Sequence, residues 1–230
     1  MLNKSIVWLL TVGVIVSGFL ELQNLLNGSA HDKAIATGYF IAIFYTLIFG
    51  FLLRKIIQKL FTRFSNTILL FTIIGSLGAA LVETSIWFAQ TLYETTGAAI
   101  SSNIWVDLIM TMPFYILLTF FFAKLATRYW FSWKIAAISG GFYEIIADGV
   151  IGNLFIGNVF GILLAPFLFP IFIVVYSPII LTPFLLLSPR LVPTQELKGK
   201  KYLKLLWPTL AVLILPISIF LGYLLDKTLK

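Results

Sequence analysis

The chain consists of long apolar runs separated by short polar stretches. A helix needs roughly 20 mostly apolar residues to cross a bilayer, and seven runs reach about that length. They lie at about 5–26, 35–57, 67–92, 104–127, 131–151, 158–187 and 204–225. The pattern therefore predicts an all-α fold, a polytopic transmembrane helical bundle of about seven spans. The spans occupy nearly the whole chain, so we expect a single domain, 1–230, with no soluble domain beside it.

Composition supports this interpretation. Only 11% of the residues are charged and 60% are hydrophobic, whereas a soluble domain carries about 25% charged residues. So little charge cannot coat a water-facing surface. The formal net charge of +7 does not predict a nucleic-acid partner, because the basic residues fall in loops between apolar runs. The chain has no cysteine, which excludes disulfides, thiol catalysis and cysteine-ligated metals.

The basic residues predict an orientation. All but three of the 16 Lys and Arg residues fall on one side of the expected bundle. Loops rich in Lys and Arg stay in the cytoplasm, so we predict a cytoplasmic N-terminus and place the multi-pass protein in the cell membrane. The first run exceeds the usual signal-peptide core, and we expect it to be a retained anchor. The residues on the basic side are Lys4, Arg54, Lys55, Lys59, Arg63, Lys124, Arg128, Lys134, Arg190, Lys198, Lys200, Lys201 and Lys204.

Prolines and small residues distinguish some spans from others. The sixth run contains Pro166, Pro170, Pro178 and Pro183. Because proline kinks or breaks helices, this run should be bent, or should end in an interfacial piece. Clusters of glycine, alanine and serine mark the third and fifth spans. Small residues let membrane helices approach closely, so these two spans should be interior.

The acidic residues are the main candidates for chemistry. The chain has nine, and all except Glu196 fall in the outer loops or the outer halves of spans: Glu21, Asp32, Glu83, Glu94, Asp107, Glu144, Asp148 and Asp226. Ionisable residues within a membrane are costly and usually functional. Their one-sided placement predicts a polar cavity that opens toward the outer leaflet between spans three, four and five.

Three of these acids are candidate catalytic residues because of their depth or spacing. Glu83 lies deep in the third span, where it could donate a proton, bind a cation or only anchor neighbouring helices. Glu144 and Asp148 are four residues apart, which places both on one face of an α-helix. Two carboxyl groups so close should not both ionise readily, which would leave one neutral and able to donate a proton. Alternatively, Asp148 only ends the helix in water.

The remaining polar residues have simpler interpretations. Asp107 begins the fourth span, where the helix dipole favours an acid, although we keep it as a candidate catalytic residue. Glu21 and Glu94 should be solvated near the interface. His31 is the only histidine, so a histidine-dependent metal site is not expected. We predict no metal and no cofactor.

Several aromatic residues lie near the outer acids. Trp87 follows Glu83 by four residues and shares its helical face. Trp105 and Tyr143 are close to Asp107 and Glu144 along the chain. Any one of them could belong to the aromatic belt at the membrane interface. As a group, their ring faces could stabilise a cation, such as a carbocation formed from an isoprenoid. We therefore consider Trp87, Trp105 and Tyr143 candidate substrate-binding residues.

Spans three to six resemble the membrane carotenoid-biosynthesis family that includes the hydratases of C50 carotenoid pathways. Glu83 takes the position of that family's glutamate, Met112-Pro113-Phe114 its proline-bearing span, and the stretch 141–148 its helix with two acids. Gly157-Asn158-Val159-Phe160-Gly161 matches the stretch that follows, which implies that Asn158 binds substrate. The chain has Asp148-Gly149 where the family has Asp-Pro. The resemblance implies addition of water to a polyprenyl double bond.

These features suggest an intramembrane enzyme, a hydratase (lyase) or cyclase (isomerase), whose partner is an isoprenoid or similar lipid. Membrane-embedded terpene cyclases also protonate isoprenoids with acids, so hydration and cyclisation both stay open. A proton- or cation-coupled transporter or channel is the alternative, because the same acids could bind a cation or relay protons. A membrane subunit whose acids only pair helices is a third interpretation. The oligomeric state is left open.

Overall fold

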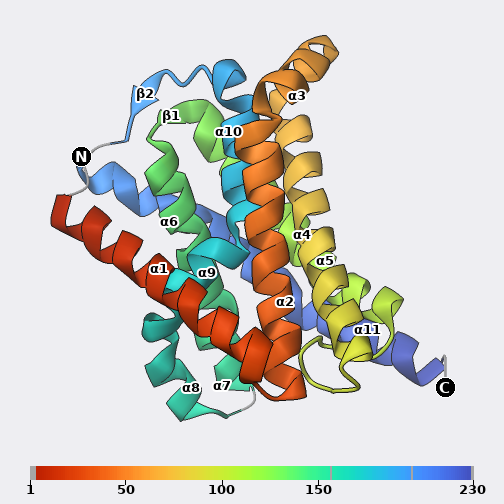
Figure 1. The fold of residues 1–230 in the computed structure, drawn as a ribbon. Coiled ribbons are helices and arrows are strands. Elements are labelled where there is room, and N and C mark those ends of the chain that lie inside the picture. The colour runs from red at the N-terminus through yellow and green to blue at the C-terminus, as the bar shows by residue number, and fades with distance from the viewer. Residues whose placement is uncertain (1–3, 156, 198, 229–230) are drawn as a thin grey trace.

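The computed structural model describes residues 4–155, 157–197 and 199–228, apart from the side chains of Ile6, Asp148 and Phe155. The described chain is almost entirely helical, as predicted (Figure 1). The longer α-helices are α1 (Lys4–Asn27), α2 (Ala30–Tyr45), α4 (Thr67–Leu92), α5 (Ile104–Arg128), α6 (Trp133–Glu144) and α11 (Leu215–Thr228). The shorter ones are α3 (Arg54–Leu60), α7 (Asn153–Phe155), α8 (Val159–Leu164), α9 (Phe169–Val175) and α10 (Thr182–Leu187).

Segments of 3-10 helix and π-helix join these α-helices. The π-helical segments are η1 (Thr46–Leu52), η3 (Ile145–Gly152) and η5 (Ser177–Leu181). The 3-10 segments are η2 (Phe61–Arg63), η4 (Ala165–Leu168), η6 (Ser188–Arg190) and η7 (Gly199–Ile214). Two short strands, β1 (Tyr129–Trp130) and β2 (Gln195–Glu196), pair in parallel. This pairing ties the loop after α5 to the loop after η6.

Six helical stretches are long and apolar enough to cross a membrane: Val7–Asn27, Ala30–Leu52, Thr67–Leu92, Ile104–Arg128, Trp133–Gly152 and Gly199–Thr228. A seventh forms if Val159–Val175 and Ser177–Arg190 count as one broken span with a bend of 47°. The count thus fits the prediction of about seven. The bend predicted for the proline-rich sixth run is present, and it falls at Tyr176.

Polar side chains fix where the long helices begin. The Asn66 side chain accepts a hydrogen bond from the backbone N–H of Leu69 and starts α4. The Asn103 side chain does the same for α5. Ser29 and Asp32 form a capping box at the start of α2, which satisfies backbone N–H groups that have no helical partner. Because α1 ends only two residues earlier, this cap makes α1 and α2 a tight antiparallel hairpin.

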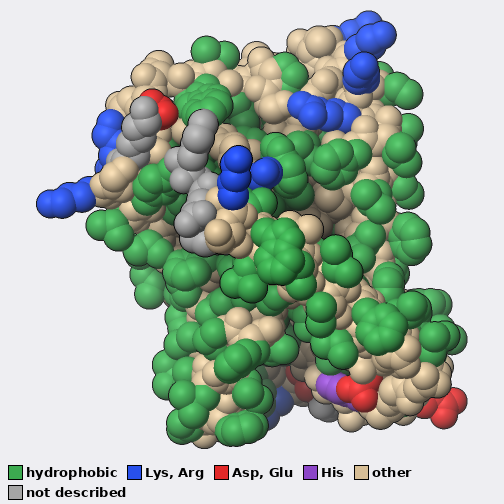
Figure 2. Space-filling model, turned by 60° about the vertical axis from the view of Figure 1, so that its left-hand side comes forward, with side chains coloured by type: hydrophobic (Ala, Val, Ile, Leu, Met, Phe, Trp, Pro, Cys, Tyr) green, Lys and Arg blue, Asp and Glu red, His purple; other side chains and the backbone are tan. Residues whose placement is uncertain are grey.

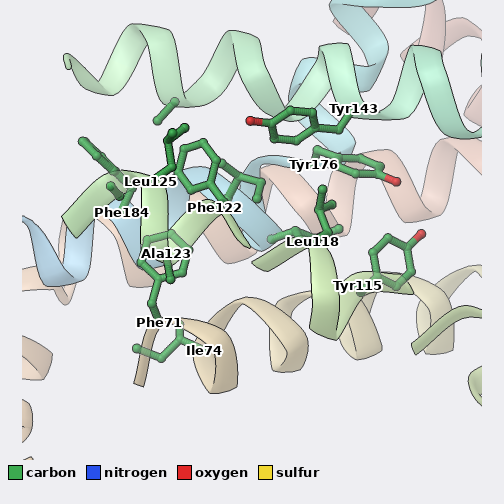
Figure 3. Packing of buried hydrophobic residues seen from close by; sticks show 14 of the residues in the cluster. Phe71, Ile74, Tyr115, Leu118, Phe122, Ala123, Leu125, Tyr143, Tyr176 and Phe184 are labelled. Carbon is green, nitrogen blue, oxygen red and sulfur yellow. The ribbon is translucent and has the colours of Figure 1, made fainter. Parts of the chain in front are cut away.

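The core lies where α4, α5, α6 and the broken span meet (Figure 3). Aromatic side chains connect these helices. The ring of Phe122 on α5 lies 5.8 Å from that of Phe71 on α4 and 6.1 Å from that of Tyr143 on α6, measured between ring centroids. In their most apolar windows, 56% of the residues of Ile104–Arg128 and 53% of those of Trp133–Gly152 are buried. The share is 44% for Thr67–Leu92 and 11% for Val7–Asn27. The third and fifth spans are thus interior, as expected, and the fourth is interior too.

Glycines let the broken span enter this core. A Cβ atom on Gly78 of α4 would lie 2.5 Å from the carbonyl oxygen of Pro178, and one on Gly75 would lie 2.5 Å from that of Ile179. On the other side, a Cβ on Gly141 of α6 would lie 2.9 Å from the backbone nitrogen of Ile173. The backbone of the broken span is therefore wedged between α4 and α6 at distances that only glycine permits.

The surface separates charge by sign (Figure 2). Lys and Arg side chains gather toward one end, most Asp and Glu side chains of this view lie at the other, and apolar side chains cover the region between them. Large apolar residues on this surface are strongly exposed, such as Trp8 at 67% and Phe167 at 79%. Soluble monomers seldom expose so much contiguous apolar surface.

The close contact of Gly78 with the Pro178 carbonyl can be tested by substitution. Gly78→Ala should lower the free energy of unfolding by about 1–3 kcal/mol, because the new methyl group must displace the Pro178 carbonyl. Gly18→Ala is the matched control, because a Cβ there would meet only the Tyr39 hydroxyl at an ordinary 3.6 Å. Thermal unfolding in detergent measures both variants. Equal midpoints for the two would show that α4 and η5 are not in close contact.

Candidate functional site

Glu83 of α4 and Tyr115 of α5 form the polar contact at the centre of the candidate site. The Tyr115 hydroxyl donates a hydrogen bond to Glu83 Oε1, with 2.6 Å between the oxygens. An O–H···O distance of 2.6 Å lies at the short end of the usual range for such hydrogen bonds. Tyr115 is buried and Glu83 is half-buried. The hydrogen bond therefore fixes the orientation of a carboxyl group within two of the most apolar helices.

Tyr176, at the bend of the broken span, adds a second phenol to this pair. Its ring centroid lies 6.0 Å from that of Tyr115, and the two rings meet edge to face. The ring of Tyr176 is 1% exposed. Figure 3 shows the hydroxyl groups of Tyr115 and Tyr176 pointing toward the same end of the core, whereas that of Tyr143 points the opposite way. Tyr115 thus contacts residues from two other helical segments, Glu83 of α4 through its hydroxyl and Tyr176 of the broken span through its ring.

Glu144 lies on the neighbouring helix α6 and is 7% exposed. Gly140 precedes it by four residues, and a Cβ on Gly140 would lie 3.1 Å from Cβ of Tyr176. Residues four apart share one face of an α-helix. Glu144 therefore lies on the face of α6 that packs against the bend, so the second candidate acid is buried beside the same broken span as Tyr176.

The backbone between Glu144 and Asp148 is π-helical, not α-helical. The π-helical segment η3 begins directly after Glu144 and contains Asp148. In such a segment the backbone bonds from residue i to residue i+5 rather than i+4, so the α-helical spacing used to place both acids on one face does not apply. The side chain of Asp148 lies outside the described part of the chain. π-Helical bulges are frequent at functional sites.

Asp107 and Trp87 have contacts of a different kind. Asp107 is fully buried, and its Oδ1 accepts a hydrogen bond from the backbone N–H of Ser101 at 3.1 Å. Nε1 of Trp87 donates to the carbonyl oxygen of Ser102 at 2.9 Å. Both side chains therefore hold the loop between the end of α4 and the start of α5. These contacts give each residue a structural role.

The other three predicted binding residues lie in different surroundings. Trp105 is 72% exposed on the surface of α5. Tyr143 is buried in the core and packs edge to face on Phe122. The Asn158 side chain is exposed and accepts a hydrogen bond from the backbone N–H of Gly161 at 3.0 Å. Asn158 is thereby the N-cap of α8.

Tyr115 and Tyr176 were not among the sequence candidates. A signal for Tyr115 does exist, because Asp107, Thr111, Tyr115 and Thr119 repeat every four residues along α5. All four are buried, so they form one polar stripe that faces the interior. Tyr176 gives no such signal, since its position depends on where the sixth span breaks.

Glu21 was expected to be solvated, and that expectation is wrong. Glu21 is 4% exposed between α1 and its neighbours, and the Asn24 side chain donates to its Oε2 at 3.3 Å. One turn earlier, Ser17 Oγ lies 3.0 Å from the Tyr39 hydroxyl of α2. The α1–α2 hairpin thus buries a polar seam of its own. Glu94, by contrast, is exposed as expected.

Comparisons with protein-family models, with curated proteins and with solved structures found no match. The resemblance to carotenoid-pathway hydratases therefore stays an interpretation of its motifs. Among the side chains that the structure describes, no three His, Cys, Asp or Glu residues gather as a metal site would require.

Gln90 of α4 anchors the loop between α4 and α5. Gln90 Oε1 accepts hydrogen bonds from the backbone N–H groups of Ala98 and Ala99, both at 3.0 Å. Gln90→Leu should leave two N–H groups without their acceptor and cost about 1–3 kcal/mol of unfolding free energy. It should also speed cleavage between residues 93 and 103 by a nonspecific protease.

Thr91→Val is the control for this loop, because Thr91 is exposed and its hydroxyl bonds only to the Trp87 carbonyl oxygen of its own helix. Cleavage and unfolding of Gln90→Leu that match those of Thr91→Val would contradict the anchoring role of Gln90.

Proposed function

We propose that the chain is a multi-pass protein of the cell membrane with its N-terminus in the cytoplasm. Three observations support this: the six apolar helices and the bent seventh, the exposed apolar surface, and the gathering of Lys and Arg at one end (Figure 2). The basic end would face the cytoplasm, because Lys and Arg are retained on that side.

Cysteine labelling tests this topology cleanly, because the chain has no cysteine of its own. Thr96→Cys and Ser65→Cys place a thiol at exposed positions in the loops after and before α4. A membrane-impermeant maleimide should label Thr96→Cys in intact cells and Ser65→Cys only after the membrane is disrupted. The reverse pattern would place the N-terminus outside, and labelling of both in intact cells would contradict a membrane crossing by α4.

Within this topology we propose that the protein is an intramembrane acid catalyst acting on an isoprenoid-type lipid, with Glu83 as the proton donor. The contact of Glu83 with Tyr115, which also meets the ring of Tyr176, carries this proposal. The Tyr115 hydroxyl bonds to Oε1, so the proton for transfer would be held on Oε2. General acids must be oriented in this way before they can act.

The proposed reaction begins when the Glu83 carboxylic acid gives its proton to one carbon of a double bond. The π electrons form the new C–H bond, and the adjacent carbon becomes a cation. The electron-rich faces of Tyr115 and Tyr176 suit stabilisation of such a cation. Either water adds to the cation and the resulting oxonium ion loses a proton, or an internal alkene adds and the new cation loses a proton from an adjacent carbon. In both cases this proton returns to the Glu83 carboxylate. Hydration or cyclisation would result, and the acid is regenerated.

Glu144 has a supporting place in this scheme. It is a buried acid on the face of α6 that packs against the bend at Tyr176. From there it would orient the water that adds to the cation. In the resemblance to carotenoid-pathway hydratases, Glu83 and Glu144 take the positions of acids of that family, and a long polyprenyl chain matches the apolar surroundings of both residues.

Substitution of Glu83 tests the catalytic proposal. Glu83→Gln keeps an oxygen that can accept the Tyr115 hydrogen bond but removes the transferable proton, so product formation should fall by about 10²–10⁴-fold. Tyr115→Phe should lower it by about tenfold, because the acid loses its orientation. The measurement is mass spectrometry of polyprenyl and carotenoid substrates incubated with purified protein in D₂O, where the product should gain deuterium at the protonated carbon.

Glu94→Gln is the control, because Glu94 is an exposed acid at the same end of the protein. It should leave product formation unchanged. A wild-type protein that is inert across the panel, or a Glu83→Gln variant as active as wild type, would overturn the proposal.

The broken sixth span favours a second candidate function, a proton- or cation-coupled transporter. Transporters often place their binding sites at interrupted helices near the bilayer midplane, and here a 47° bend lies beside a buried acid. Ion or proton flux into proteoliposomes that Glu83→Gln abolishes, without any lipid product, would favour transport over catalysis.

A further inference from the structure

An apolar cleft of about 570 Å³ lies on the opposite side of the broken span from Tyr115. Four elements line it: α1, the junction of α2 with η1, the first turns of α6, and the junction of α9 with η5. Its lining includes Val14, Ile43, Ala137 and Val174, and almost all of its walls are apolar. The volume falls within the range of about 300–1,000 Å³ that is usual for small-molecule sites.

The cleft exists because α1 and α2 diverge. The two helices are joined by the Ser17–Tyr39 hydrogen bond, and α1 touches α9 where a Cβ on Gly13 would lie 2.9 Å from Pro170. In Figure 1, α1 runs diagonally to α2, so its N-terminal end lies far from that helix. The α1 residues that line the cleft, from Val7 to Ile15, all precede Ser17.

The polar atoms on its walls are already engaged within the protein. Thr46 Oγ1 and Ser177 Oγ lie 2.7 Å apart, and the Thr11 hydroxyl donates to the carbonyl oxygen of Val7. These groups complete their bonds without a ligand. The walls consequently suit a hydrocarbon chain better than a polar solute.

Positive charge marks one end of the cleft. Lys134 is the one charged residue in its described lining, is exposed, and holds its Nζ 5.9 Å from the centroid of the Trp133 ring. Lys4 lies one turn before Val7 of the lining on α1. An apolar wedge that ends at a lysine is complementary to an amphiphile with an acyl chain and an anionic head.

We infer that this cleft binds an anionic phospholipid of the cytoplasmic leaflet, with one acyl chain between α1 and α2 and its phosphate beside Lys134. The inference rests on the proposed membrane location but not on the chemistry at Glu83. Because the buried residues of α1, Ser17 and Glu21, both lie in its C-terminal half, the bound chain would fill the gap beneath its N-terminal half. The lipid would thereby fix the tilt of α1.

Photo-crosslinking tests this inference. The purified full-length protein is reconstituted into vesicles that contain phosphatidylglycerol or phosphatidylcholine with the same diazirine-bearing acyl chain. In the wild type, phosphatidylglycerol should label residues 7–15 and 43–47 about fivefold more than phosphatidylcholine. Lys134→Gln should remove most of that preference, and Ala137→Phe, which fills the cleft, should reduce labelling by both lipids.

Lys124→Gln is the matched control, because Lys124 is an exposed lysine at the same end, packed over Phe120 and outside the cleft. It should keep the preference. Equal labelling by the two lipids in the wild type, or equal losses in Lys124→Gln and Lys134→Gln, would overturn the inference. So would loss of labelling on addition of soluble glycerol phosphate, which would indicate a phosphate site instead of a lipid site.

Lys124 and Lys134 are both exposed, so neither substitution should disturb folding. The comparison of Lys124→Gln with Lys134→Gln therefore tests lipid binding even if Ala137→Phe does not fold. Glu83→Gln should label like the wild type, which separates failure of this inference from failure of the proposed catalysis.

Discussion

The contact of the η5 backbone with α4 is the constraint on which the rest of the interior depends. The carbonyl oxygens of Pro178 and Ile179 lie over Gly78 and Gly75, where any side chain would push them away. This contact holds the bend of the sixth span inside the bundle. The bend in turn presents Tyr176 to Tyr115, and Tyr115 orients Glu83. Without the glycines, the broken span could not bring Tyr176 against Tyr115.

Much of the fold could be predicted from the sequence because hydropathy alone determines which segments can span a bilayer. The third span was predicted as 67–92 and α4 has those bounds; the fourth was predicted as 104–127 and α5 ends one residue later. These boundaries are sharp because Asn66 and Asn103 cap both helices. The bend in the sixth run was also predictable, since its prolines cannot continue a regular helix.

The candidate site was only partly predictable, because contacts between helices depend on rotation and tilt that composition does not encode. The depth of Glu83 could be read from its place in the third span, but its partner Tyr115 could not be assigned without knowing which face of α5 meets α4. Glu21 was misjudged for a similar reason. Its position near a helix end suggests water, yet the tight hairpin of α1 with α2 buries it. Trp87 and Asp107 bond to an irregular loop, and an irregular loop has no periodic sequence pattern. Their hydrogen bonds to that loop could therefore not be predicted from the sequence.

The broken sixth span has a consequence for how the protein is made. Val159–Val175 and Ser177–Arg190 are each shorter than the roughly 20 residues that a lone span requires. In the proposed membrane protein, neither half would enter the bilayer readily on its own. The two would partition together and pack against Gly75 and Gly78 of α4, which is synthesised earlier. The proline-rich sixth span would thus pack into the bundle only after the first five spans have assembled.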